Sequence, residues 1–285
     1  MPNQSIHHYE NFPVASWLCP AQLRPAIVAI YHFARTADDI ADEGQAPPTQ
    51  RLEQLQHYRN TLIKTSAHGP KEVPHDWQWI FHPLHQALIT HQLPTNLLLQ
   101  LLDAFEQDVR NPTYSTRDEL LHYCQHSANP IGRLLLHLYG VTDVRSLEQS
   151  DAICSALQLI NFWQDMHIDV ARNRCYIPLS DLSRVKLTRH QLQPGLHQPA
   201  ITELMRNLVE WSRQLMLCGA PLALRLPGRI GWELRWVIQG GLRILEKIHH
   251  NQYQCLVKRP QIKVWDAPIL GWRTLFMNRT YRDTP

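Results

Sequence analysis

The chain has 285 residues, and its balance of 44% hydrophobic and 19% charged side chains is that of a folded globular protein, which excludes an intrinsically disordered one. Its formal net charge is only +3, so the composition gives no support for a nucleic-acid partner. The six cysteines are widely spaced without a CxxC pair, which argues against a zinc centre.

The apolar side chains recur with helical periodicity along most of the chain. In chain order, this pattern predicts helices at 22–43, 49–65, 95–109, 115–139, 147–172, 199–217 and 229–250. Pro130 is expected to kink or interrupt the fourth helix, and proline-rich stretches at 45–48, 68–74 and 193–199 predict loops. Because alternating β-branched runs are nearly absent, we expect an all-α bundle that forms a single domain over residues 1–285.

The first predicted helix ends in "YHFARTADDIADEG", which places four acids within six positions. At 100° per residue, Tyr31, Arg35, Asp38 and Asp42 share one face, and the two aspartates lie about 6 Å apart along the axis. Asp39 and Glu43 are expected to point away from this face. Like charges one turn apart cost a few tenths of a kcal/mol, so either a solvated helix end or a cation site explains the cluster.

A second polar stripe lies in "QLINFWQDMHID", where Gln158, Asn161, Asp165 and Asp169 are spaced by three, four and four residues. These side chains fall on one face of a helix whose other faces are apolar. Carboxylates buried without partners are costly, so the stripe calls for cations, and an all-oxygen donor set suits Mg²⁺. A polar surface stripe on an amphipathic helix is the alternative interpretation.

Two facing acidic stripes in a helical bundle would bind a diphosphate through Mg²⁺, because Mg²⁺ is commonly shared between carboxylates and phosphates. Three nearby arginines could hold the remaining phosphate oxygens. These are Arg35, Arg172 and Arg174.

The two motifs, "YHFARTADDIAD" and "LQLINFWQDMHIDVARNRCYIP", resemble those of the squalene/phytoene synthase family. The resemblance extends to "LLDAFEQDV", "YCQHSANPIG" and "ELRWVIQGGLRILEKI", and so covers nearly the whole chain. It implies an all-α isoprenoid-synthase fold with a central cavity and a Mg-dependent enzyme whose substrate is an isoprenoid diphosphate.

Matching positions imply the following site. The metal ligands are Asp38, Asp42, Asn161, Asp165 and Asp169; the residues that line the reaction cavity are Tyr31, Tyr123 and Gln158; the substrate is bound by Arg35, Arg174 and Tyr176. Arg35 also counts among the catalytic residues.

The opening "HHYENFPVAS" and "FARTADDIADEG" are most similar to the branch that converts presqualene diphosphate and water into hydroxysqualene and diphosphate, a carbon–oxygen lyase reaction in hopanoid synthesis. Two departures from the wider family bear on this. "YENF" replaces a basic stretch that condensing members carry, with Glu10 near the expected cation, which fits a single substrate that is already condensed. Gly240 and Gly241 stand where many relatives have a tyrosine, and either enlarge a pocket or allow close helix packing.

Three alternatives stay open. One is a condensing synthase that makes presqualene diphosphate, squalene or phytoene from two prenyl diphosphates. Another is a terpene cyclase, which also uses acidic helical metal motifs, and the third is a catalytically silent helical partner in a lipid-synthesis complex.

The beginning of the chain lacks a basic-then-apolar signal, and no apolar stretch approaches the ~20 residues of a membrane span. A cytoplasmic enzyme is therefore expected. Its C30 substrate is compatible with peripheral contact at the inner membrane face and with coupling to other enzymes of squalene synthesis.

Overall fold

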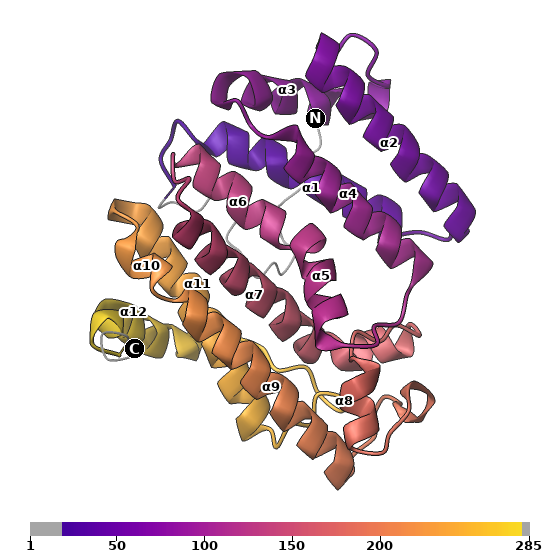
Figure 1. The fold of residues 1–285 in the computed structure, drawn as a ribbon, viewed down its shortest axis with the longest axis vertical. Coiled ribbons are helices and arrows are strands. Elements are labelled where there is room, and N and C mark those ends of the chain that lie inside the picture. Colours follow the sequence, from indigo (N-terminus) through magenta and orange to yellow (C-terminus); the bar gives the residue numbers. More distant parts are fainter. Residues whose placement is uncertain (1–18, 281–285) are drawn as a thin grey trace.

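The computed structural model describes residues 19–280, and every regular element within them is helical, which confirms the all-α prediction (Figure 1). The α-helices are α1 (Arg24–Asp42), α2 (Pro48–His68), α3 (Gln78–His91), α4 (Thr95–Arg110), α5 (Arg117–Ser127), α6 (Asn129–Leu138), α7 (Val144–Ala171), α8 (Leu179–Arg184), α9 (Pro199–Gly219), α10 (Leu222–Arg225), α11 (Gly228–His250) and α12 (Ala267–Thr280). Three 3₁₀ turns accompany them: η1 (His75–Trp77), η2 (Arg189–Gln191) and η3 (Val264–Asp266). None of these helices is both long and apolar enough to cross a membrane.

The 28-residue helix α7 runs through the middle of the molecule, between the N-terminal helices and α9 to α11 (Figure 1). It packs against α5, α6, α9, α10 and α11, and it buries side chains on several of its faces. Two of its buried side chains bond to other parts of the chain: Trp163 Nε1 donates to Ser212 Oγ at 2.7 Å, and Gln164 Nε2 donates to the carbonyl of Pro260 at 2.7 Å. These bonds fix the rotation of α7 about its axis and therefore the direction of its acids.

Helix α1 buries one face made of alanines, Ile30 and Phe33 against α3 and α4. Its C-terminal carbonyls are capped by Arg51 of α2, whose guanidinium donates to Ala41 O at 2.5 Å and to Gly44 O at 2.8 Å. A cation at a helix C-terminus offsets the negative end of the helix dipole. Arg51 thereby stabilises the helix end at which the four acids of the first motif are gathered.

The seven predicted helical ranges all contain helices, and the predicted interruption near Pro130 is confirmed. Helix α5 ends before Ala128, and α6 begins there with Pro130 in its first turn. The sequence pattern did not reveal α3 and α12. Pro83 lies inside α3, and α12 is apolar on opposite sides, so neither shows a single apolar stripe.

Of the two glycines, Gly241 serves close packing, and the enlarged-pocket interpretation is wrong for it. A Cβ at Gly241 would lie 2.8 Å from Met216 Cε, 3.2 Å from Leu157 and 3.3 Å from Ile160. Helix α11 therefore approaches α7 and α9 at this point more closely than a side chain allows. A Cβ at Gly240 would meet only Ile262, at the ordinary distance of 3.6 Å.

Gly241→Ala is expected to lower the free energy of unfolding by about 1–3 kcal/mol, because overpacking displaces the side chains of α7 and α9. Gly240→Ala is the matched control, and it should be neutral or stabilise by up to about 1 kcal/mol, because alanine is the better residue inside a helix. Urea unfolding of both variants measures the difference. Equal effects of the two substitutions would contradict the packing role of Gly241.

Candidate active site

The C-terminal ends of α1 and α7 meet through an ion pair between Asp42 and Arg174. After α7 ends, Asn173 adopts a left-handed conformation with φ of 57°, and the Arg174 amide donates to the carbonyl of Asp169 at 2.7 Å. This tight turn directs the Arg174 guanidinium back to α1, where it donates to both carboxylate oxygens of Asp42, with one bond of 2.8 Å. The two motifs, which were predicted to face each other, are thus joined by one arginine.

A third carboxylate, Asp108 near the end of α4, joins this cluster. Tyr123 and Tyr176 donate their hydroxyls to it at 2.9 Å and 3.2 Å. The ring of Tyr176 stacks on Phe162 of α7 with a centroid distance of 3.7 Å. Two predicted residues, Tyr123 and Tyr176, therefore meet at Asp108, for which the sequence had suggested no role.

The cluster holds more negative charge than its arginines balance. Burial raises the pKa of Asp108 to about 7 and that of Asp169 to about 7, and it raises the pKa of Asp38 to about 6. Neighbouring carboxylates add to each shift, Asp165 for Asp169 and Asp42 for Asp38, while Arg174 opposes all three. Its bonds to Asp42 in turn raise the pKa of Arg174. A further cation at this place would relieve the remaining repulsion.

Asp165 is held by a residue that the helical pattern did not reveal. Arg259, in the loop before η3, donates to both oxygens of Asp165, one of them from Nη2 at 3.1 Å. The Asp165 side chain is 18% exposed and that of Arg259 is 23% exposed. Their separation of 94 residues left no sequence signal for this pair.

One detail of the first motif is corrected. Asp39 and Glu43 were expected to point away from Arg35, but Arg35 Nη2 lies 2.6 Å from Asp39 and 2.9 Å from Glu43, and Arg35 Nη1 lies 3.2 Å from Asp38. The long arginine side chain spans two turns of its own helix and reaches residues at i+4 and i+8. Arg35 is therefore engaged by acids of α1 itself.

The other predicted residues lie on the expected helices. Tyr31 is half-buried on α1, one turn before Arg35, and Gln158 and Asn161 are half-buried on α7, before Asp165. Arg172 is exposed, and its guanidinium is 3.9 Å from Asp42. The "YENF" segment with Glu10 lies outside the described residues.

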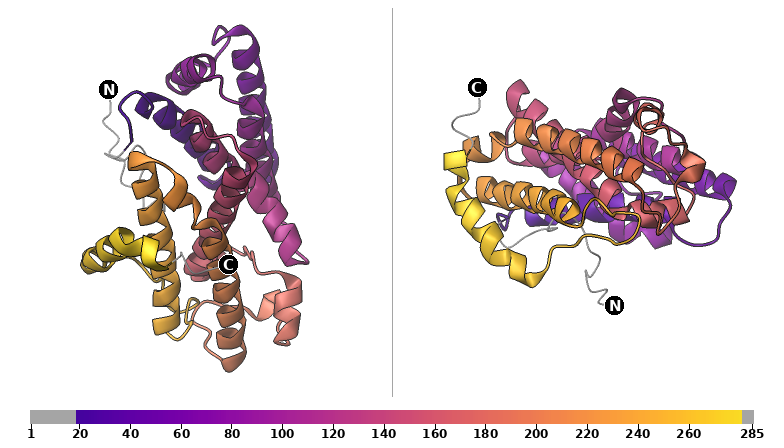
Figure 2. Two further views of the ribbon diagram at one scale, coloured as in Figure 1. Left: turned by 60° about the vertical axis from the view of Figure 1, so that its left-hand side comes forward. Right: turned by 90° about the horizontal axis from the view of Figure 1, so that it is seen from below.

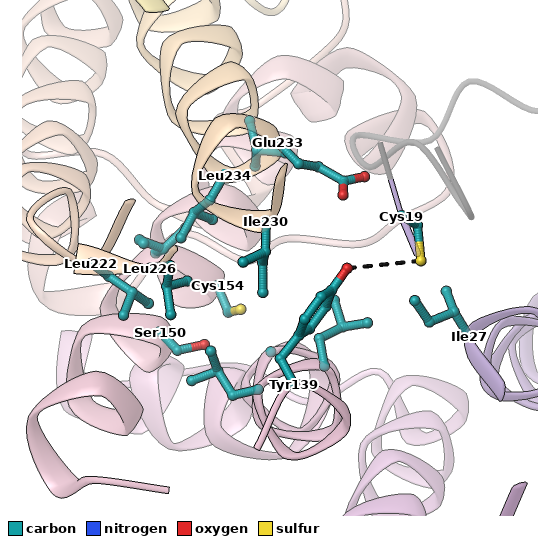
Figure 3. A pocket seen from close by; sticks show the side chains of 15 residues that line it. Cys19, Ile27, Tyr139, Ser150, Cys154, Leu222, Leu226, Ile230, Glu233 and Leu234 are labelled. Carbon is teal, nitrogen blue, oxygen red and sulfur yellow. Dashed lines mark hydrogen bonds between the residues drawn. The ribbon is translucent and has the colours of Figure 1, made fainter. Parts of the chain in front are cut away.

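An apolar cavity of about 120 Å³ lies along the other half of α7, between α1, α6, α10 and α11 (Figure 3). Ile153 and Cys154 of α7 line it, together with Ile27 of α1 and Leu234 of α11. With a rise of 1.5 Å per residue, Ile153 and Asp165 are about 18 Å apart along the helix. Helix α7 thus carries apolar, cavity-lining residues near Ile153 and carboxylates near Asp165, about 18 Å apart along its axis.

The family model for squalene/phytoene synthases matches residues 6–266. The chain is 34% identical to a hydroxysqualene synthase of Rhodopseudomonas palustris over 80% of this chain and 75% of that one. It is 31% identical to a hydroxysqualene synthase of Sinorhizobium fredii over 86% and 80%. A crystal structure of a squalene synthase from Alicyclobacillus acidocaldarius superposes with a TM-score of 0.77, at 33% identity, over 86% of this chain and 90% of that one.

The chain belongs to the squalene/phytoene synthase family. This confirms the resemblance that was drawn from the two acidic motifs and the segments between them. The bundle around α7 is the isoprenoid-synthase type of fold that the solved relative also has.

For a squalene/phytoene synthase, the donor set at the acidic end fits Mg²⁺. The predicted ligands are all oxygen donors, and burial raises the pKa values of Asp38 and Asp169, so a bound cation would stabilise their charged forms. Within residues 19–280, no three His, Cys, Asp or Glu side chains converge as a ready-made metal site. Arg174 and Arg259 instead occupy Asp42 and Asp165. The metal roles of the five predicted ligands stay predictions.

Asp108→Asn should stabilise this squalene/phytoene synthase more at pH 8 than at pH 5. The pKa of Asp108 is above its ordinary value of 3.8 in the folded state, so the stability that its proton contributes is present below about pH 4 and is lost as the pH rises through about 7. One pKa unit corresponds to about 1.4 kcal/mol, so the gain at pH 8 should reach about 1 kcal/mol or more. Urea unfolding of the metal-free protein at both pH values measures it.

Asp118→Asn, at an exposed acid on α5, is the control and should shift stability little at either pH. A gain for Asp108→Asn that is the same at pH 5 and pH 8 would show that Asp108 is already ionised at the lower pH.

Proposed function

We propose that the protein converts presqualene diphosphate and water into hydroxysqualene and diphosphate. The observation that carries the proposal is the pairing of an acid-and-arginine cluster with an apolar cavity at opposite ends of α7, in a chain similar to hydroxysqualene synthases. A diphosphate fits the charged end, and the apolar end can receive part of the C30 hydrocarbon. The enzyme is accordingly a carbon–oxygen lyase that acts on a phosphate.

At the charged end, Arg174 and Arg35 bind the phosphate oxygens and orient the leaving group. Both arginines are paired with acids of α1, so they are already held at the place where the diphosphate arrives. Asp38, Asp42, Asn161, Asp165 and Asp169 would hold Mg²⁺, which would supply positive charge to stabilise the leaving diphosphate.

The cation that remains needs protection from premature capture. The rings of Tyr123, Phe162 and Tyr176 form one cluster beside the acids, with Tyr123 and Phe162 6.0 Å apart. Aromatic faces attract a desolvated cation by about 2 kcal/mol each. Tyr31 on α1 and Gln158 on α7 extend this lining. Water then adds its oxygen to the rearranged cation and releases one proton, which gives hydroxysqualene.

We further propose that the enzyme works in peripheral contact with the inner face of the membrane, coupled to the enzymes that supply its substrate and use its product. Both molecules carry about thirty carbons and partition into lipid. Transfer through water would therefore be slow.

Incubation with presqualene diphosphate and Mg²⁺ should give hydroxysqualene, with the same product when NADPH is added. Extraction and gas chromatography–mass spectrometry of the products measure this. Squalene as the main product with NADPH would overturn water capture. Farnesyl diphosphate alone should be left unconsumed, and its conversion to presqualene diphosphate or squalene would favour the condensing alternative.

Asp38→Ala and Asp165→Ala should each lower kcat by about 10²–10³-fold or more, because each removes charge that stabilises the leaving diphosphate. Asp103→Ala is the control: this acid lies on α4, is 52% exposed and pairs with Arg59 outside the cluster. It should leave kcat unchanged. Near-normal turnover in both site variants would exclude the acidic motifs from the chemistry.

A further inference from the structure

The C-terminal part of the described chain concentrates exposed apolar side chains. Thirteen large hydrophobic side chains are exposed within residues 19–280, and eight of them lie between 232 and 275. We define the tryptophan face by six of these: Trp232 and Trp236 of α11, Val264 and Trp265 of η3, and Ile269 and Trp272 of α12. Four of the nine tryptophans of the chain thus point outward on one part of the surface.

Contacts between α11 and α12 bring several of these side chains close together. Helix α12 lies across α11 on the outside of the molecule (Figure 2). The six-membered ring of Trp236 is 3.6 Å from the Cβ position of Gly271, so Trp236 reaches α12. Trp272 continues the surface by contact with the ring of Phe276 at a centroid distance of 4.2 Å.

Helix α12 is apolar on two opposite sides. Leu270 and Met277 are buried, 6% and 1% exposed, on the side that packs toward the bundle. Ile269, Trp272 and Leu275 lie on the opposite side and are 38%, 65% and 59% exposed. A helix that is apolar all round belongs in an apolar environment on both sides. The protein covers only one side of α12, so its outer side is adapted to a second apolar phase.

The charge around the tryptophan face is positive. Residues 228–280 contain nine Lys and Arg but three Asp and Glu, so this segment exceeds the formal net charge of +3 of the whole chain. Glu246 and Asp266, two of the three acids, are neutralised by ion pairs with Arg243, Lys247 and Arg273. Arg229, Lys258 and Lys263 are exposed bases of the same segment.

Two of the cations lie directly over tryptophan rings. The Arg235 guanidinium is 4.6 Å from the ring centroid of Trp232, and the Lys263 ammonium is 4.8 Å from that of Trp265. Tryptophan favours the boundary between water and hydrocarbon, and basic groups beside it reach the anionic headgroups. Apolar residues and cations at the same level are the composition of an interfacial helix.

We infer that the tryptophan face docks the protein on an anionic lipid bilayer. Helix α12 lies in the headgroup region with Trp265, Ile269 and Trp272 toward the acyl chains, while Arg229, Lys258 and Lys263 contact acidic headgroups. The same helix α11 that presents Trp232 and Trp236 outward lines the apolar cavity with Ile230, Leu234 and Val237. The docked orientation therefore leaves α11 between the cavity and the bilayer. The observations for docking are independent of the proposed function, but its purpose, the exchange of a lipid substrate, rests on that function.

The test is sedimentation of the full chain with sucrose-loaded vesicles, without substrate. Vesicles of phosphatidylcholine with about one third phosphatidylglycerol should bind the protein at least tenfold more tightly than phosphatidylcholine alone, and the preference should shrink as salt screens the charges. Trp265→Ser/Trp272→Ser should lower binding at least tenfold, and Lys258→Glu/Lys263→Glu should abolish the preference for the anionic lipid.

Trp79→Ser is the matched control, because Trp79 is 54% exposed on α3, at the other end of the molecule (Figure 1). It should bind vesicles like the unchanged protein, and circular dichroism should show all variants folded. Equal binding by the Trp265→Ser/Trp272→Ser variant would overturn the inference. A second outcome would also overturn it: the unchanged protein does not bind vesicles and is a dimer in analytical ultracentrifugation, and the Trp265→Ser/Trp272→Ser variant is a monomer. A second copy of the chain would then cover the tryptophan face.

Activity on detergent-dispersed presqualene diphosphate separates this inference from the proposed function. The Trp265→Ser/Trp272→Ser variant should keep the kcat of the unchanged protein in detergent. Vesicle binding without any turnover would sink the proposed function and leave the docking surface standing, whereas turnover without vesicle binding would do the reverse.

Discussion

The guanidinium group of Arg174 neutralises part of a cluster to which three helices contribute carboxylates. It binds Asp42 directly, and its charge also acts on Asp38, Asp108 and Asp169. Without it, the ends of α1, α4 and α7 would bring like charges together in a poorly hydrated place, where repulsion is strong. One arginine does not balance this many acids. Burial, together with neighbouring carboxylates, therefore keeps the pKa values of Asp38, Asp108 and Asp169 raised. The helix ends are thus held together by a charge arrangement whose remaining repulsion a further cation would relieve.

The helical pattern was enough to place the acids and the general fold, because periodicity is a local property that follows from 3.6 residues per turn. It predicted that Asp42 and Asp169 belong to facing stripes and that Arg174 is near both. It did not reveal Asp108 or Arg259, since their partners are distant in the chain and nothing in their local sequence marks them. It also misjudged Arg35, because an angle between Cα positions ignores how far a long side chain reaches. Helix α12 was also not predicted, because it is apolar on two sides and so lacks the single apolar stripe by which an amphipathic helix is recognised.

Helix α7 divides its length between two environments that rarely coexist on one helix. Near Ile153 it lines an apolar cavity, and near Asp165 it presents carboxylates, while Trp163 and Gln164 fasten its rotation to α9 and to the Pro260 loop. Helix α11 packs closely against α7 at Gly241, next to Leu157 and Ile160. Arg51 stabilises the C-terminal end of α1, because it binds terminal carbonyls that would otherwise add negative potential beside Asp42. The Arg51 cap on α1 and the close packing of α7 at Gly241 thus support helix ends that carry acids, although the helix dipole disfavours negative charge there.

The wide separation in sequence of the ion-paired groups has a consequence for the order in which the chain acquires its structure. One hydrophobic cluster is built from residues between 26 and 138, whereas the cluster around α7 extends from 104 to 277. Asp42 is 132 residues from Arg174, and Asp165 is 94 residues from Arg259. During synthesis, the N-terminal cluster can close long before these arginines leave the ribosome, and contacts of such long range form late. The acids of α1 then face water until the second half of the chain arrives. A nascent chain consequently cannot hold both of these ion pairs until residue 259 has been synthesised, which makes the charged end a marker of completed folding.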